Sequence, residues 1–253
     1  MVERRPWFRR LRRVIGTTIR ALVPEVTRNR LRAAWHRFKF RGPAHLCPIC
    51  DSKLKLFPNT MCPVCGSKQG HRLVWLLRLR DIPLAGRTVH VLHVAPEWSI
   101  RRRLKAMPNV KYVSGDIRPG HGDLCFDVQE LPFPEATFDL IYCAHVLNCV
   151  PDDQRAMREL YRVLKPRGCA ILEVPIKSDG TPTLEADDSD AARIKLFGDP
   201  VIRRVYGHDY LTRLSSVGFM PFWDNTLSAL PAEDQLRYGL GYTQMIVCDK
   251  PVE

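Results

Sequence analysis

The stretch that decides the fold runs from residue 89 to residue 147 and contains the segments VHVLHVA (89–95), KYVSGD (111–116) and FDLIYCA (138–144). Each segment is rich in β-branched and aromatic residues and is bounded by proline or charged residues, which is typical of strands buried on both faces of a parallel sheet. Further strands are expected at 170–175, 219–223 and 244–248. The pattern predicts an α/β fold with a Rossmann-like, mostly parallel sheet of seven strands and helices on both faces.

Acidic residues follow two of the predicted strands. Asp116 ends the second strand and Asp127 closes the third. An acid about twenty residues after the first strand is where nucleotide-binding α/β proteins place a partner for ribose. A single Asp at such a place often only caps a turn, but two at one edge of the sheet favour a nucleotide-like cofactor.

The formal net charge of +12 lies almost entirely in residues 1–42, which hold thirteen Lys or Arg residues and two acids. The rest of the chain is therefore close to neutral. Apolar residues recur at helical spacing between Pro6 and Pro24, and again at Leu31, Trp35 and Phe38. We expect a basic amphipathic helical segment over residues 1–42 that contacts an anionic membrane surface. The alternatives are packing on the protein's own domain, binding to nucleic acid, which is less favoured, and an arginine-rich organelle presequence, which is the least favoured.

No window of the sequence approaches the length of uninterrupted apolar residues that a membrane span needs, and the first residues lack the pattern of a secretory signal. We therefore expect a cytoplasmic protein, peripheral at the inner face of the membrane if residues 1–42 bind lipid.

Two C-x-x-C pairs give the clearest local signal, with the cysteines at Cys47, Cys50, Cys62 and Cys65. Four thiolates at this spacing predict one tetrahedral Zn²⁺ and leave no open position for catalysis, so the metal is expected to be structural. We expect a zinc-ribbon-like module over 43–72, with a hairpin through residues 57–59, followed by a catalytic domain over 73–253. His71 is expected to be an ordinary polar residue.

The segments FDLI (138–141) and RELYRVLKPRG (158–168), with an acid at each expected strand end, resemble class I S-adenosylmethionine-dependent methyltransferases of the type 11 group. The resemblance covers about residues 85–250. Several enzymes of that group share the cysteine pairs, the HR-x-x-W stretch at 71–75 and the V-A-P-E turn at 94–97. The resemblance implies S-adenosylmethionine as methyl donor. It implies that Asp116 binds the ribose and that adenine contacts Asp127, Val128 and Gln129. It also implies that the turn from Ala95 to Ser99 holds the methionine moiety, with Ala95, Pro96 and Glu97 as cofactor-binding residues, and that Ile117 contacts the cofactor.

The first motif departs from the family pattern of an acid, one residue and then G-x-G-x-G. His93 stands at the position of the acid, and the three glycine positions hold Ala95, Glu97 and Ser99. Larger side chains limit how closely the backbone approaches a ligand. Glu97 could compensate by pairing with the ammonium group of the cofactor; the alternative is a site that has lost its cofactor.

Methyl transfer from a sulfonium needs mainly positioning, with a general base if the acceptor is a hydroxyl. His145, just after the fourth strand, is the candidate base, with a purely structural histidine as the alternative. Tyr206 and His208 are expected near the acceptor. Residues 177–205 form a charged, lid-like insertion or a surface loop.

Because the catalytic domain is nearly neutral, we expect methylation of a small-molecule, sugar or lipid-linked acceptor. An RNA methyltransferase that grips its substrate with the zinc module and the arginine-rich arm remains an alternative, as does a non-catalytic zinc-containing scaffold.

Overall fold

The computed structural model describes residues 25–252 except 81, 83–85 and 242–244. The helix predicted between Pro6 and Pro24 lies outside the described residues.

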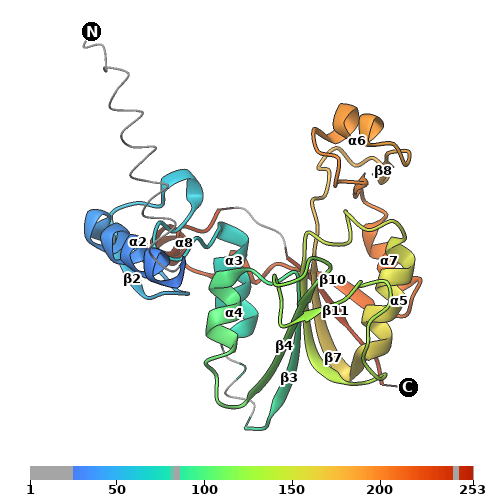
Figure 1. Cartoon of the computed structure of the whole chain (residues 1–253), viewed down its shortest axis with the longest axis horizontal. Helices are drawn as coiled ribbons and strands as arrows, with labels where there is room; N and C mark the ends of the chain where they lie inside the picture. The colour runs from blue at the N-terminus through green and yellow to red at the C-terminus, as the bar shows by residue number, and fades with distance from the viewer. Residues whose placement is uncertain (1–24, 81, 83–85, 242–244, 253) are drawn as a thin grey trace.

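A seven-stranded sheet forms the centre of the fold (Figure 1), with the strand order β10-β11-β7-β6-β3-β4-β5. The strands are β3 (Val89–Val94), β4 (Val110–Asp116), β5 (Leu124–Cys125), β6 (Phe138–Ala144), β7 (Leu164–Glu173), β10 (Met220–Asp224) and β11 (Met245–Asp249). Neighbours from β7 to β5 are parallel, whereas β11 is antiparallel to both β10 and β7. The predicted Rossmann-like, mostly parallel sheet is therefore confirmed.

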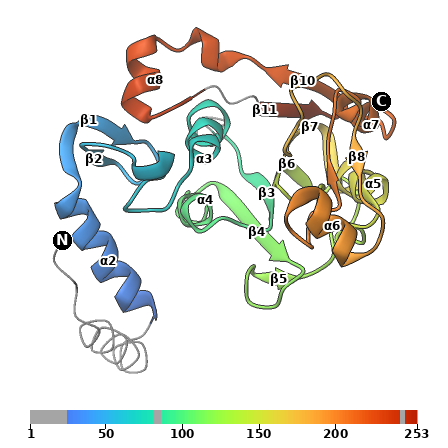
Figure 2. The same cartoon turned by 90° about the horizontal axis from the view of Figure 1, so that it is seen from above.

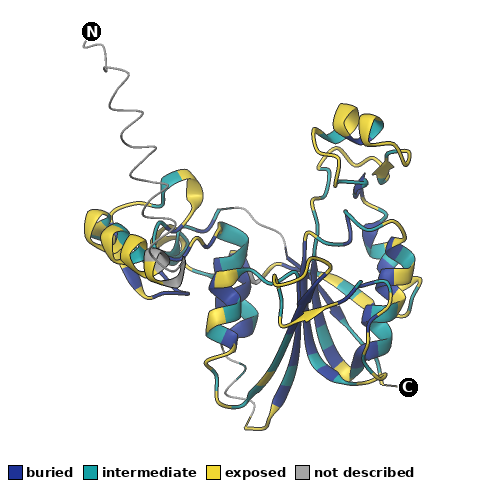
Figure 3. Cartoon of the chain, viewed as in Figure 1, coloured by how far each residue is buried: buried dark blue, intermediate teal, exposed yellow. Residues whose placement is uncertain are grey.

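Helices cover both faces of the sheet (Figure 1). One face packs against α3 (Gln69–Val74), the π-helical turn η2 (Trp75–Leu79) and α4 (Trp98–Leu104), and the other against α5 (Asp153–Val163) and α7 (Tyr210–Ser215). Successive side chains of a strand point to opposite faces, so Val91 joins the first core and Leu92 the second. Figure 3 shows the strands between these layers as mostly buried.

Two strand boundaries differ from the sequence-based expectation. The third strand, β5, is only two residues long, so Asp127 lies beyond its end rather than closing it. The fifth strand, β7, begins at Leu164, and its register with β6 shifts between Phe138 and Leu140. The predicted turn at Lys165–Gly168 is present as an irregularity inside the strand, because Arg167 adopts a positive φ of 61°.

The cysteine-rich segment begins with α2 (Glu25–Lys39) and a hairpin of β1 (Arg41–Cys47) and β2 (Ser52–Leu54). The hairpin turns inside the first cysteine pair, where the amide of Asp51 donates to the carbonyl oxygen of Cys47 at 2.8 Å. The expected hairpin through residues 57–59 was wrong: a short 3-10 helix, η1 (Pro58–Thr60), lies there.

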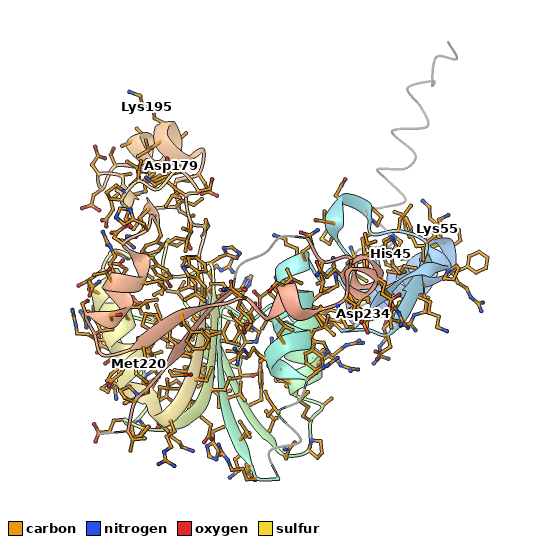
Figure 4. The ribbon with its side chains drawn as sticks, turned by 180° about the vertical axis from the view of Figure 1, so that it is seen from behind. His45, Lys55, Asp179, Lys195, Met220 and Asp234 are labelled. Atoms are coloured by element: carbon orange, nitrogen blue, oxygen red, sulfur yellow. The ribbon has the colours of Figure 1, made fainter. Side chains whose placement is uncertain are left out.

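A C-terminal excursion joins this segment to the sheet. Between β10 and β11 the chain forms η4 (Thr226–Ala229) and α8 (Ala232–Tyr238), which lies against β1 (Figure 2). The ring nitrogen Nδ1 of His45 lies 2.8 Å from the carbonyl oxygen of Leu236, and Figure 4 shows His45 beside the helix that carries Asp234. Leu54 and Leu240 belong to the same hydrophobic core as Val91, so the cysteine-rich segment and the sheet share one core.

The insertion after β7 contains β8 (Leu184–Glu185), α6 (Asp190–Phe197) and β9 (Arg204–Val205) and rises beyond the carboxyl edge of the sheet (Figure 1). The buried guanidinium of Arg204 fixes its base by donating to the carbonyl oxygens of Leu147, Val150 and Pro151 at 2.7–2.9 Å. Within the described part of the chain, no helix is both long and apolar enough to span a membrane.

Candidate active site and metal centre

The four predicted cysteine ligands come together in one buried cluster. The Sγ atoms of Cys47 and Cys65 lie 3.7 Å apart, as do those of Cys50 and Cys62, and all four lie within 4.8 Å of one another. Tetrahedral zinc with Zn–S bonds of about 2.3 Å places its sulfur ligands roughly 3.8 Å apart. The cluster therefore has the dimensions of a Zn²⁺ site.

Two serine hydroxyls surround this cluster. Ser52 Oγ lies 3.2 Å from Cys50 Sγ, and Ser67 Oγ lies 3.2 Å from Cys65 Sγ. Hydroxyl groups here can donate hydrogen bonds to metal-bound thiolates and orient them. The donor set fits zinc, and the closed arrangement fits a structural metal.

Arg72 lies beside the cysteine cluster and is fully buried. Its guanidinium donates to the carbonyl oxygens of Thr60, Ser67, Tyr238 and Gly239 at 2.6–3.1 Å and lies 4.1 Å from the ring centroid of Phe57. Burial lowers the pKa of Arg72 below its ordinary value, whereas the neighbouring cysteine thiolates act in the opposite direction. Arg72 thus joins the segment around Cys62 and Cys65 to the end of α8.

The predicted cofactor residues lie along the carboxyl edge of the sheet. Ala95 follows β3, Asp116 ends β4 and Asp127 follows β5. The amide of Ala95 donates to the carbonyl oxygen of Gly115 at 2.8 Å, and that of Phe126 to Asp116 at 3.3 Å. The structure therefore places these three segments next to one another.

Asp116 is 6% exposed, and its carboxylate is held by Arg118. Oδ1 accepts from the backbone amide and Nε of Arg118 at 2.8 and 3.1 Å, and Oδ2 accepts from Nη2 at 3.1 Å. Burial opposes ionisation, but the hydrogen bonds from Arg118 hold the pKa of Asp116 below its ordinary value. The Arg118 side chain is 66% exposed, and exposed ion pairs contribute at most about 1 kcal/mol. The carboxylate of Asp116 is thus ionised and paired with an arginine that lies at the protein surface.

The residues expected to contact adenine form a tight turn. Asp127 accepts from the backbone amide and the side-chain amide of Gln129 at 2.9 Å each, and Gln129 in turn accepts from the amide of Asp152. Val128 is buried in the core, which leaves its backbone rather than its side chain for a ligand. Ile117, by contrast, is largely exposed at this edge and could cover an aromatic ring.

The turn after β3 keeps its shape without glycine. Ala95 adopts a φ of +50°, the left-handed region that glycine enters most easily. Pro96 follows it and leads into Glu97, the residue before α4. The side chain of Glu97 folds back, and its Oε2 lies 2.8 Å from Nε2 of His93. The carboxylate therefore returns to the position in the motif that an acid usually occupies.

Glu97 also faces the cysteine-rich segment. Its Oε1 lies 3.6 Å from Nε2 of His71, and His93 contacts the hydroxyl of Tyr112 through Nδ1 at 3.0 Å. Burial opposes ionisation of Glu97, but the hydrogen bond with His93 and the field of both histidines hold its pKa below the ordinary value. His71, expected to be an ordinary polar residue, thus connects the metal module to the cofactor edge.

A pocket of about 440 Å³ opens between the cysteine-rich segment and the carboxyl ends of β6 and β7. His145 and Glu173 line it from the sheet, and Lys68 and His71 line it from the other side. The remaining lining residues are Thr60, Gln69, Gly70, Val174, Ile176, Trp223 and Ile246. Pockets of this size accept small molecules.

His145 enters this pocket from a turn in which its own φ is +56°, and its amide donates to the carbonyl oxygen of Glu173 at 2.8 Å. Partial burial lowers the pKa of His145 below its ordinary value; the charge of Glu97 acts in the opposite direction, and that of Lys68 adds to the lowering. The imidazole is therefore neutral at physiological pH and able to accept a proton.

Glu173 was missed as a functional candidate. Burial, followed by the charge of Glu97, raises the pKa of its carboxyl group to about 7. The hydroxyl of Tyr142 donates to Glu173 Oε2 at 3.3 Å. The sequence feature that could have indicated Glu173 is its position as an acid at the end of β7, after the apolar residues 170–172.

The expected role of Tyr206 near the acceptor was wrong. Tyr206 is fully buried, and its hydroxyl donates to Asp153 Oδ2 at 2.8 Å and lies 3.2 Å from the carbonyl oxygen of Leu147. The ring therefore anchors the insertion to α5. His208 is exposed, and its amide donates to the carbonyl oxygen of Thr181 at 3.4 Å, so it too belongs to the base of the insertion.

Comparison with known protein families matches residues 80–172 to a family described as "Methyltransferase domain". Residues 80–172 are therefore similar to methyltransferase domains. The match covers the strands that carry Ala95, Asp116 and His145. The matched residues thus include the carboxyl ends of β3, β4 and β6.

Curated relatives match parts of the same region. The 27-O-demethylrifamycin SV methyltransferase of Amycolatopsis mediterranei is 33% identical over 95 residues, which are 38% of this chain and 34% of that protein. The malonyl-[acyl-carrier protein] O-methyltransferase of Halorhodospira halophila is 29% identical over 140 residues, 52% of this chain and 40% of that protein. The chain thus spans about a third to two fifths of the length of these relatives.

Solved structures similar to the chain include an S-adenosylmethionine-dependent methyltransferase from Mesorhizobium loti, with a TM-score of 0.43 and 14% identity over 65% of this chain and 92% of that one. The cyclase SpnF has a TM-score of 0.46 and 19% identity over 70% of this chain and 81% of its own.

Proposed function

We propose that the protein is an S-adenosylmethionine-dependent methyltransferase whose acceptor is a hydroxyl group of a small-molecule, sugar or lipid-linked compound. The observation that carries this proposal is the pocket at the carboxyl edge of the methyltransferase domain. Its lining residue His71 lies 3.6 Å from the predicted cofactor residue Glu97, and the pocket contains His145 together with Glu173, a carboxyl group whose pKa is about 7.

The cofactor would lie along the edge formed by the ends of β3, β4 and β5. Asp116 would bind the ribose hydroxyls, because an ionised carboxylate accepts two hydrogen bonds. The turn at Asp127 would receive the adenine, and Glu97 would pair with the ammonium group. When bound, S-adenosylmethionine supplies an activated methyl group. These residues fit it because the pKa values of Glu97 and Asp116 are held below their ordinary values, which keeps both carboxylates ionised, and because the three segments are adjacent.

The acceptor would enter between the sheet and the cysteine-rich segment. His145 would take the proton of the acceptor hydroxyl, as predicted from the sequence, and Glu173 offers a second base in the same pocket. A pKa near 7 suits general-base catalysis, because the group is then partly deprotonated at working pH and still holds a proton well. Val174, Ile176 and Trp223 give this pocket an apolar wall.

The size of the pocket supports a small acceptor or the end group of a larger one. The insertion with α6 stands beyond the same edge of the sheet and could cover a bound acceptor, as expected for a lid (Figure 1). The relatives are named for a rifamycin precursor and for a malonyl group on a carrier protein, which agrees with a small or carrier-bound acceptor.

Calorimetric titration with S-adenosylmethionine tests the proposal. The intact protein is expected to bind, Asp116→Ala to lose most of the affinity, and Asp234→Ala on α8 to retain it. Absence of binding by the intact protein would contradict the enzyme function and favour the scaffold alternative. Transfer of labelled methyl groups into lipid, sugar and RNA pools of a cell extract then identifies the acceptor class. Label in RNA alone would favour the RNA alternative.

A further inference from the structure

The helix α2 presents an apolar stripe to solvent. Leu31, Trp35 and Phe38 are 64, 60 and 76% exposed, and the rings of Trp35 and Phe38 lie 6.2 Å apart. Their spacing of four and three residues places them on one face of the helix. Figure 3 shows α2 as one of the most exposed helices of the protein. Three large apolar side chains together on one exposed face mark an interaction surface rather than scattered surface residues.

The opposite face of α2 is fixed to the cysteine-rich segment. His36 Nδ1 lies 2.6 Å from the carbonyl oxygen of Pro63, and Arg37 Nε donates to Ser52 Oγ at 3.3 Å. Phe40, just after the helix, packs against the hydrophobic core. The helix therefore cannot turn its apolar stripe inward without breaking these contacts.

Cations flank the stripe on both sides. At roughly 100° per residue, Arg32 and Lys39 lie along one border and Arg30 and Arg37 along the other. All four side chains are exposed. An apolar stripe between two rows of cations is the arrangement of a helix that lies in the headgroup layer of an anionic membrane.

A basic groove adjoins the stripe. Its volume is about 550 Å³, and its lining includes Phe38 from the stripe and the cations Arg37, Arg41 and Lys53. Asp51 is the acid among its lining residues, and its carboxylate pairs with Arg103 at 3.2 Å. The groove therefore has a net positive charge and could receive a phosphate group of a lipid whose chains contact Phe38.

We infer that this α2 surface, composed of the Leu31–Trp35–Phe38 stripe and the groove of Arg37, Arg41 and Lys53, docks the protein on an anionic phospholipid membrane. The stripe inserts among the acyl chains near the headgroups, and the cations contact lipid phosphates. A nucleic acid would use the cations but leave the three apolar side chains in water, and a second copy of the chain would bring like charges together. The charge pattern thus favours the lipid surface. The inference is independent of the proposed methyl transfer.

Sedimentation of the full-length protein with vesicles tests the inference. Vesicles of phosphatidylcholine mixed with phosphatidylglycerol are expected to bind the protein, with affinity falling as ionic strength rises, and vesicles of phosphatidylcholine alone to bind much less. The triple variant Leu31→Ser, Trp35→Ser, Phe38→Ser is expected to lose roughly tenfold or more in affinity. Arg37→Glu with Lys53→Glu is expected to lose the preference for anionic vesicles.

Leu236→Ser provides the matched control, because Leu236 is 70% exposed on α8 and lies outside the α2 surface. It is expected to bind vesicles as the unaltered protein does. Circular dichroism and metal content check that each variant is folded. Equal binding by the triple variant would overturn the inference, since residues 1–24 would then carry the binding. Binding of the full chain to an RNA oligonucleotide without vesicle binding, or a dimer abolished by the triple variant without vesicle binding, would overturn it as well.

Discussion

Nε2 of His93 lies 2.8 Å from Oε2 of Glu97. These two residues occupy the acid position and the second glycine position of the first motif. In this chain the carboxylate belongs to Glu97, four residues after the acid position of the motif, but its side chain folds back to the end of β3. If Glu97 pairs with the ammonium group of S-adenosylmethionine, its carboxylate should be required for binding of the cofactor.

Glu97→Gln should weaken binding of S-adenosylmethionine by about tenfold or more, because an amide cannot neutralise an ammonium group. Calorimetric titration measures the effect. His93→Gln is the control, since it can keep a hydrogen bond to Glu97, and a loss of less than about threefold is expected. Unchanged affinity in Glu97→Gln would refute this role of the carboxylate.

Arg118→Ala should strengthen binding of S-adenosylmethionine by a fewfold, because the guanidinium no longer competes for the carboxylate of Asp116. Arg87→Ala removes a comparable exposed ion pair, with Asp139 at the amino end of the strands, and should leave the affinity unchanged. Weaker binding in Arg118→Ala would instead assign Arg118 a contact with the cofactor.

Glu173→Gln should stabilise the fold above pH 7. The pKa of Glu173 is raised from 4.5 to about 7, so its contribution to stability is present below pH 4.5 and is lost as pH rises through 7. By pH 8 the ionised carboxyl costs roughly 3 kcal/mol, which glutamine avoids. Urea unfolding at pH 4.5 and pH 8 should show a gain for the variant at pH 8 alone. An equal effect at both pH values would exclude a raised pKa.

The same substitution addresses catalysis once an acceptor is known. If Glu173 removes the proton, kcat should rise with pH through an inflection near 7, and Glu173→Gln should abolish this inflection. His145→Gln is the companion variant: loss of the inflection there, with Glu173→Gln unaffected, would leave His145 as the base.

Cys62→Ser should lose the bound metal and several kcal/mol of folding free energy, because a structural zinc site is coupled to folding. Elemental analysis should find one zinc per chain in the intact protein and close to none in the variant. Cys125→Ser, at an exposed cysteine outside the cluster, should keep both metal and stability. Metal retained by Cys62→Ser would contradict the four-cysteine site.

Arg72→Met should destabilise the protein by about 3 kcal/mol or more, because four carbonyl oxygens lose the hydrogen bonds of this fully buried guanidinium. Arg102→Met removes an exposed arginine of α4 and should change the free energy of unfolding by less than about 0.5 kcal/mol. Thermal and urea unfolding compare the two variants. Similar values for both would show that the contacts of Arg72 add little.

Local patterns in the sequence predicted the sheet and the metal cluster well. The apolar runs at β3 and β6 belong to strands buried on both faces. Such strands can be recognised from their own residues, without knowing which strands they pair with. The spacing of Cys47, Cys50, Cys62 and Cys65 predicted their convergence, because each pair is held together by its own short turn. Each of these features is encoded within a few neighbouring residues.

The features that could not be predicted depend on the local conformation of turns or on contacts between distant parts of the chain. The raised pKa of Glu173 comes from burial and from Glu97, which lies on another strand's turn. The engagement of Asp116 by Arg118 depends on the conformation of a turn, and the fully buried position of Tyr206 depends on how the insertion packs on α5. Sequence periodicity carries no information about such pairings.

The contact between β1 and α8 has a consequence for the order of folding. His45 and the carbonyl group of Leu236 are separated by 191 residues in the chain. During synthesis, β1 and the cysteines that follow it emerge from the ribosome well before α8, the helix that packs against β1. The β1–β2 hairpin therefore stays uncovered on one side until α8 has been synthesised, and early binding of the proposed zinc would protect the nascent chain during that interval.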